Sequence, residues 1–150
     1  MDTGRVETSR LSGRIKILLE IIDRFSNAFA HPTSSLLHEY ILLCRLKGGK
    51  KLPGLQSYDF HAYMRGPYSE ELRNDLEKLY RMNLIGVRGG RLVVTEPGKE
   101  LSQKNRKGTD YKTATETCQE VLKDFSTAHA ISEGLFDSLR DVSLGEIIRY

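Results

Sequence analysis

The sequence predicts an α+β fold, in which a winged helix-turn-helix domain carries a helical C-terminal extension. Three observations support this. Apolar residues recur at helical spacing early in the chain, a leucine-striped segment follows Gly66-Pro67, and two β-rich arms flank Gly89-Gly90. Helices followed at once by an antiparallel hairpin are the order of elements in a winged helix. We expect a loose N-terminus (1–12), a winged-helix domain (13–107) and a helical extension (108–150).

Two amphipathic helices are expected at the start of the domain. The first has its apolar stripe within residues 14–29 and should end before His31-Pro32. The side chains of Thr33-Ser34-Ser35 can cap the second, which Gly48-Gly49 should stop.

A third helix is expected after a sharp turn. Alternating residues at 58–64 predict one extended segment with one face inward, and Gly66-Pro67 should end it. Ser69 is placed to cap the helix, and Glu70-Glu71 lie in its first turn, where the helix dipole favours negative charge. The helix should bury its leucines and end at Asn83.

A two-stranded hairpin, the wing, is the next predicted element. Residues 84–88 and 91–95 are rich in β-formers, and Gly89-Gly90 between them is a strong hairpin signal. Thr95 followed by Pro97 is typical of a helix start and predicts a short helix to about residue 104.

The extension should contain further helices. An apolar stripe begins after Thr113, Ser132 could cap a later helix, and residues 143–150 could start one more.

Charge is unevenly distributed along the chain. Only four of the 23 basic residues, but eight of the 20 acidic ones, lie in residues 110–150, so residues 1–109 are basic. Such asymmetry suggests an anionic partner for the first part, although the two parts could equally attract each other.

Several classes of protein fit the sequence poorly. No apolar run approaches a membrane span, and the N-terminus lacks the apolar region of a secretory signal. Cys44 and Cys118 fit reduced, half-buried thiols, and the four histidines lack metal-ligand spacing. With no phosphate-binding glycine loop or nucleophile motif, we expect a cytoplasmic protein without membrane contact, cofactor or enzymatic activity.

Residues 58–86, YDFHAYMRGPYSEELRNDLEKLYRMNLIG, resemble a signature of poorly characterised bacterial and archaeal winged-helix proteins. The signature joins an aromatic extended segment, Tyr-x-Gly-Pro-Tyr-Ser, Leu-x-x-Asp-Leu-x-x-Leu and a Gly-Leu-Ile start to the wing. Here one extra residue precedes Gly66, and Asn83 replaces the last glycine. The resemblance implies the fold and points loosely to antitoxin-like partners or to PadR-type regulators, which dimerise through a C-terminal helix.

The wing and the third helix hold the candidate nucleic-acid-binding residues. Arginines at a wing tip can reach phosphates or a minor groove, and arginine and asparagine are suitable base-reading types. The acids Glu70-Glu71 argue against base reading, because they stand near where base edges would be met. The alternative is a solvated, internally paired surface. The candidates are Arg73, Asn74, Lys78, Arg81, Arg88 and Arg91.

From these residues we expect a DNA-binding transcriptional regulator. The alternative is a protein–protein interaction module, antitoxin-like or assembly-forming, that uses the same fold without binding nucleic acid. A homodimer would place two wings on one duplex. The amphipathic extension could pack on the basic domain of the same chain or pair with a second copy. In a possible homodimer, the expected contacts lie in the extension, at Val121, Leu122, Phe125, Leu135, Phe136 and Leu139.

Overall fold

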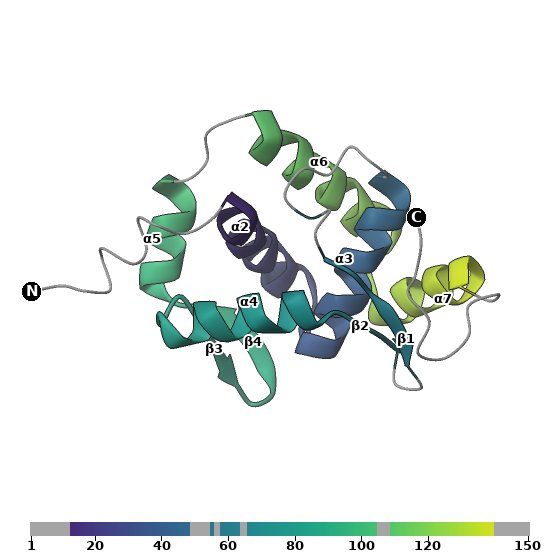
Figure 1. Ribbon diagram of the computed structural model, residues 1–150, viewed down its shortest axis with the longest axis horizontal. Coiled ribbons are helices and arrows are strands. Elements are labelled where there is room, and N and C mark those ends of the chain that lie inside the picture. Colours follow the sequence, from purple (N-terminus) through teal and green to yellow (C-terminus); the bar gives the residue numbers. More distant parts are fainter. Residues whose placement is uncertain (1–12, 49–54, 56–57, 64–65, 105–108, 140–150) are drawn as a thin grey trace, which may run out of the picture.

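The computed structural model describes residues 13–48, 55, 58–63, 66–104 and 109–139. Within these ranges the chain forms six helices and two separate two-stranded antiparallel sheets, an α+β architecture compatible with a winged helix (Figure 1). Helix α2 (Gly13–Ala28) lies at the centre and packs against α4 (Glu70–Arg81), α5 (Glu96–Lys104), α6 (Thr109–Asp124) and strand β4 (Arg91–Val94). Helix α3 (Ser34–Gly48) packs against α6, α7 (Ala128–Leu139) and strand β2 (Gly66–Tyr68).

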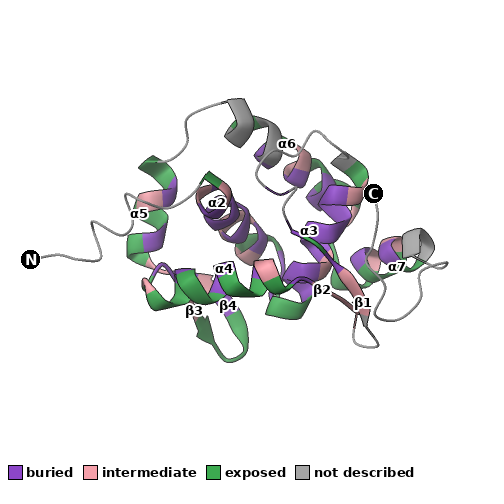
Figure 2. Cartoon of the chain, in the orientation of Figure 1, coloured by how far each residue is buried: buried purple, intermediate pink, exposed green. Residues whose placement is uncertain are grey.

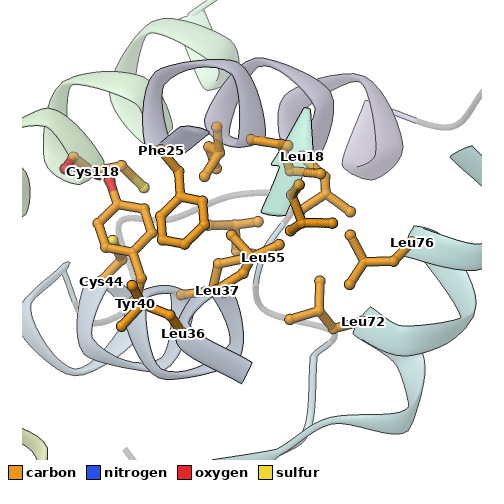
Figure 3. Close-up of a cluster of buried hydrophobic side chains, with 14 of the residues drawn as sticks. Leu18, Phe25, Leu36, Leu37, Tyr40, Cys44, Leu55, Leu72, Leu76 and Cys118 are labelled. Carbon is orange, nitrogen blue, oxygen red and sulfur yellow. Dashed lines mark hydrogen bonds between the residues drawn. The ribbon is translucent and has the colours of Figure 1, made fainter. Parts of the chain in front are cut away.

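Both predicted N-terminal helices are present, as α2 (Gly13–Ala28) and α3 (Ser34–Gly48). Thr33 caps α3, since its Oγ1 accepts a hydrogen bond from the backbone nitrogen of Leu36 at 3.1 Å. The two helices meet through fully buried side chains, among them Phe25 of α2 and Leu37 and Tyr40 of α3 (Figure 3).

The segment before the third helix differs from the prediction. The predicted extended segment is confirmed in part by strand β1 (His61–Tyr63). Its predicted end at Gly66-Pro67 is wrong, because these residues lie in β2 (Gly66–Tyr68), which pairs antiparallel with β1. Gly66 has φ +111°, a conformation that glycine adopts far more readily than other residues. Pro67 is tolerated because β2 pairs with only one neighbour in its sheet.

The β1–β2 hairpin also makes the connection between α3 and α4 longer than in a helix-turn-helix motif. Residues 49–69 separate α3 from α4 (Glu70–Arg81), and they include β1 and β2. The helix-turn-helix motif joins its helices by three or four residues. The two helices therefore correspond to such a motif only if the β1–β2 hairpin is an insertion in its turn.

Helix α4 starts and ends as predicted. Ser69 Oγ accepts a hydrogen bond from the backbone nitrogen of Leu72 at 3.2 Å, which confirms it as the N-cap. The helix ends at Arg81, and Asn83 follows with φ +58°, a left-handed conformation that asparagine tolerates.

The predicted wing is present as β3 (Ile85–Arg88) paired with β4 (Arg91–Val94). Gly89 and Gly90 have φ +57° and +79°, as a tight hairpin turn with two left-handed residues requires. The backbone nitrogen of Leu92 donates to the carbonyl of Pro32 at 2.7 Å, which ties β4 to the α2–α3 connection.

Helix α5 (Glu96–Lys104) confirms the predicted short helix, with Gly98 N donating to Thr95 Oγ1 at 3.1 Å. The extension forms α6 (Thr109–Asp124) and α7 (Ala128–Leu139). The prediction that Ser132 caps the last helix is wrong, because Ser132 lies inside α7. The cap is Thr127, whose Oγ1 accepts a hydrogen bond from the backbone nitrogen of Ala130. The helix predicted at 143–150 lies outside the described residues.

The extension belongs to the same core as the rest of the chain, and most of the predicted dimer contacts lie in that core. Val121, Leu122 and Leu135 are buried within the core of their own chain, and Phe125 packs partly against it. Helix α6 packs against α2 and α3, and helix α7 packs against α3. The buried side chains are therefore unavailable to a second copy without unpacking the fold.

Of the remaining predicted dimer contacts, only Phe136 can be placed. Its side chain is 73% exposed and lies beside a hollow lined by His129, Ser132 and Glu133 on the same helix. The side chain of Leu139 lies outside the described part of the chain.

Candidate nucleic-acid interface

The predicted nucleic-acid-binding residues lie on the outer face of α4 and at the tip of β3–β4. We call this region the α4–wing surface. Helix α4 contacts β3, and α6 lies on the opposite side of the molecule, so this helix of the extension leaves the surface open (Figures 1 and 2). All six predicted side chains are exposed: Arg73, Asn74, Lys78, Arg81, Arg88 and Arg91.

A buried polar cluster fixes the inner face of α4. Asp75 accepts a hydrogen bond from Arg14 Nη2 at 2.9 Å and lies 2.7 Å from Arg14 Nε, so α2 and α4 share a two-point ion pair. Tyr58 donates its hydroxyl to Asp75 at 2.6 Å, and the Arg14 guanidinium lies 4.9 Å from the centre of the Tyr58 ring. Burial, with the adjacent Asp75, raises the pKa of Tyr58, which keeps this donor protonated.

A second contact fixes the start of α4. The backbone nitrogen of Ser69 donates to Nδ1 of the buried His38 at 3.2 Å, and the His38 ring stacks on Tyr68 at 5.3 Å. Burial lowers the pKa of His38 to about 4, so the imidazole is neutral near pH 7 and Nδ1 is free to accept. Helix α4 is thus held by α2 on its inner face and by α3 at its N-terminus.

The wing tip concentrates positive charge. Arg88 and Arg91 are directly opposite each other in the β3–β4 register, and neither forms an ion pair with a described residue. Like charges directly opposite each other on two strands destabilise the pair. Lys78 on α4 is likewise exposed and has no ion pair within the described ranges. An anion bound at this surface would relieve the repulsion.

The acidic residues of α4 are less exposed to such an anion than the sequence suggests. The Glu71 carboxylate accepts a hydrogen bond from the backbone nitrogen of Asp59 at 2.9 Å. Glu77 pairs with Arg81 at 2.6 Å. Glu70 is exposed, but it begins a 12-residue helix whose other end leads into β3, so about 16 Å of helix separates it from that end.

The remaining reactive groups offer little chemistry. No three His, Cys, Asp or Glu side chains are grouped for a metal among the described residues. Cys44 and Cys118 are fully buried rather than half-buried, and the Tyr40 hydroxyl donates to the carbonyl of Cys118 at 2.6 Å (Figure 3). Burial raises the pKa of Cys44, which disfavours the reactive thiolate.

Sequence reasoning missed the residues that position α4. No sequence motif marks Arg14, Tyr58 or His38. The position of Asp75, in contrast, indicates a buried partner. This residue stands between Leu72, Leu76 and Leu79 on the apolar stripe, and a carboxylate there requires a buried partner.

Comparison of the chain with protein-family models, curated proteins and solved structures found no match. The resemblance to winged-helix regulators therefore stays a prediction. In the part of the chain that the structure describes, no helix has the length and apolar character needed to cross a membrane.

Proposed function

We propose that the protein binds nucleic acid, duplex DNA in particular, through the α4–wing surface. The opposed pair Arg88 and Arg91 is the observation that carries the proposal, because two exposed like charges in register favour a bound anion. A winged-helix domain with these properties would act in the cytoplasm as a transcriptional regulator.

Binding would proceed by charge neutralisation. Lys78, Arg88 and Arg91 are available to phosphates, and each contact releases counterions condensed on the DNA. Arg73 keeps its charge while donating to the Tyr68 hydroxyl at 3.3 Å. Affinity should therefore fall steeply with salt, as for any complex dominated by phosphate contacts.

The first test replaces both wing arginines, in the double variant Arg88→Ala with Arg91→Ala. Affinity for a short DNA duplex is measured by fluorescence anisotropy over a range of salt concentrations. We expect weaker binding and a log–log salt slope that is shallower by about 1.8, because each phosphate contact contributes about 0.9.

The matched control is Lys112→Ala with Lys123→Ala, which removes the same charge from α6, on the other side of the molecule. It should leave most of the affinity in place. Equal losses in both double variants would mean that net charge alone, and not the wing, attracts DNA.

A protein-interaction module is the second candidate, and two exposed apolar side chains favour it. Tyr80 of α4 is 58% exposed and Val87 of β3 is 56% exposed, and tyrosine and arginine are enriched in protein interfaces. A single partner that co-purifies with the wild type but not with Tyr80→Ala, together with indifference to DNA, would support this alternative.

A further inference from the structure

We infer that the α4–wing surface binds the nucleic-acid backbone without reading base sequence. This inference rests on the proposed function and concerns how the same surface selects its ligand. It follows from which polar groups on the surface are already engaged, and where the acidic groups lie.

The N-terminal turn of α4 is unsuited to base reading. In helix-turn-helix proteins the N-terminal residues of the recognition helix contact base edges in the major groove. Here that turn presents the exposed Glu70, while Glu71 is bound to the backbone of Asp59. A carboxylate there can accept only from the amino groups of cytosine or adenine, and the phosphates on both sides of the groove repel it.

The middle and end of α4 offer few free reading groups. Bidentate recognition of guanine needs a free guanidinium. Arg73 donates to the Tyr68 hydroxyl and Arg81 pairs with Glu77, so each must give up a contact before it can bind guanine. The exposed Asn74 and Lys78 are the remaining unpaired side chains of base-reading types on this face, within the described residues. Lys78 acts as a point charge, which suits a phosphate in any sequence.

The wing tip is suited to a minor groove, where the four base pairs are poorly distinguished. Its turn consists of Gly89 and Gly90, which have no side chains, and the flanking Arg88 and Arg91 carry charge that phosphates of any sequence can neutralise. Selection of a particular site would have to come from DNA shape or from a second protein.

The test is selection from a pool of random 20-base-pair duplexes at low salt, followed by affinity measurements on single duplexes. We expect no enriched motif and affinities that differ by about threefold or less, against the 10³-fold or more that separates specific from non-specific binding. In Asn74→Ala the ratios of affinity between duplexes should stay as in the wild type, because a lost direct base contact would weaken binding to matched sequences alone.

A motif bound about a hundredfold more tightly than unrelated duplexes, with the preference lost in Asn74→Ala, would overturn the inference. The proposed function would survive that result. If no duplex binds even at low salt, or if the wing variant binds as tightly as wild type, the proposed function fails and the inference with it.

Discussion

The buried His38 shows how the hydrogen-bond partner of a single side chain can be set by its three-dimensional surroundings. In sequence it is one of four scattered histidines, and nothing around it indicates that Ser69 N will donate to its Nδ1. Asp75 is different, because its place on a leucine stripe could have predicted a buried ion pair. Its partner Arg14 could not have been chosen, since 61 residues separate the two in sequence.

The protonation of His38 gives a prediction at this scale. The unfolded chain binds a proton near the ordinary pKa of 6.5, whereas the folded chain does not until about pH 4. Stability is therefore fully present above pH 6.5 and falls as the pH drops from 6.5 towards 4. Between pH 7 and 5, His38 should remove about 2 kcal/mol of unfolding free energy.

Urea unfolding at the two pH values would measure this loss. His38→Gln should show a smaller loss between pH 7 and 5 than wild type, because the amide can accept from Ser69 without titrating. Glu39, whose pKa burial raises, shifts stability in the opposite direction in both proteins and cancels from the comparison. The control His31→Gln alters an exposed side chain. If all three proteins lose equal stability, His38 is not the titrating group.

At the scale of elements, local sequence signals were sufficient to predict where a helix starts when a single capping residue defines that start. The caps Ser69 and Thr95 were identified from sequence, and Thr33 was one of three candidates, because a cap depends on its own first turn. The β1–β2 hairpin was missed because three-residue strands leave too short an alternating pattern to reveal where the chain reverses. The start of α7 was misplaced because both Thr127 and Ser132 are suitable caps.

The charge balance of α4 gives a prediction for this element. Glu77→Gln removes a carboxylate from the exposed face and releases Arg81, which is 75% exposed. We expect tighter DNA binding and a salt slope steeper by up to about 0.9. The exposed i,i+4 pair contributes only about 0.3–0.5 kcal/mol, so the fold should tolerate its loss.

Glu116→Gln is the matched control for this variant. It breaks a similar i,i+4 pair, with Lys112 at 4.0 Å, on α6 and away from the wing. Salt-dependent anisotropy on both variants separates a local effect from a change in net charge. Unchanged or weaker binding in Glu77→Gln would contradict a role for α4 in contacting DNA.

At the scale of the whole molecule, the sequence predicted an amphipathic extension but not what its apolar side would face. The same stripe can meet a second copy or the chain's own core, and periodicity does not distinguish these outcomes. The structure resolves the choice for Val121, Leu122 and Leu135, which pack in their own core. Within the described residues, helices α6 and α7 of the acidic extension therefore pack against α2 and α3 and leave the basic α4–wing surface open.

Burial of Leu135 within its own chain predicts how the extension contributes to stability. Leu135→Ala should lower the unfolding free energy by about 2–5 kcal/mol, the usual cost of a large-to-small change in a core. The unfolding midpoint of both wild type and variant should be independent of protein concentration, because the lost contacts are intramolecular. Phe136→Ala, at a side chain that is 73% exposed, should change stability by less than about 0.5 kcal/mol. Thermal unfolding over a hundredfold range of protein concentration would be measured for the wild type and both variants. A midpoint that rises with concentration and is lowered by Phe136→Ala would show instead that α7 holds two copies together.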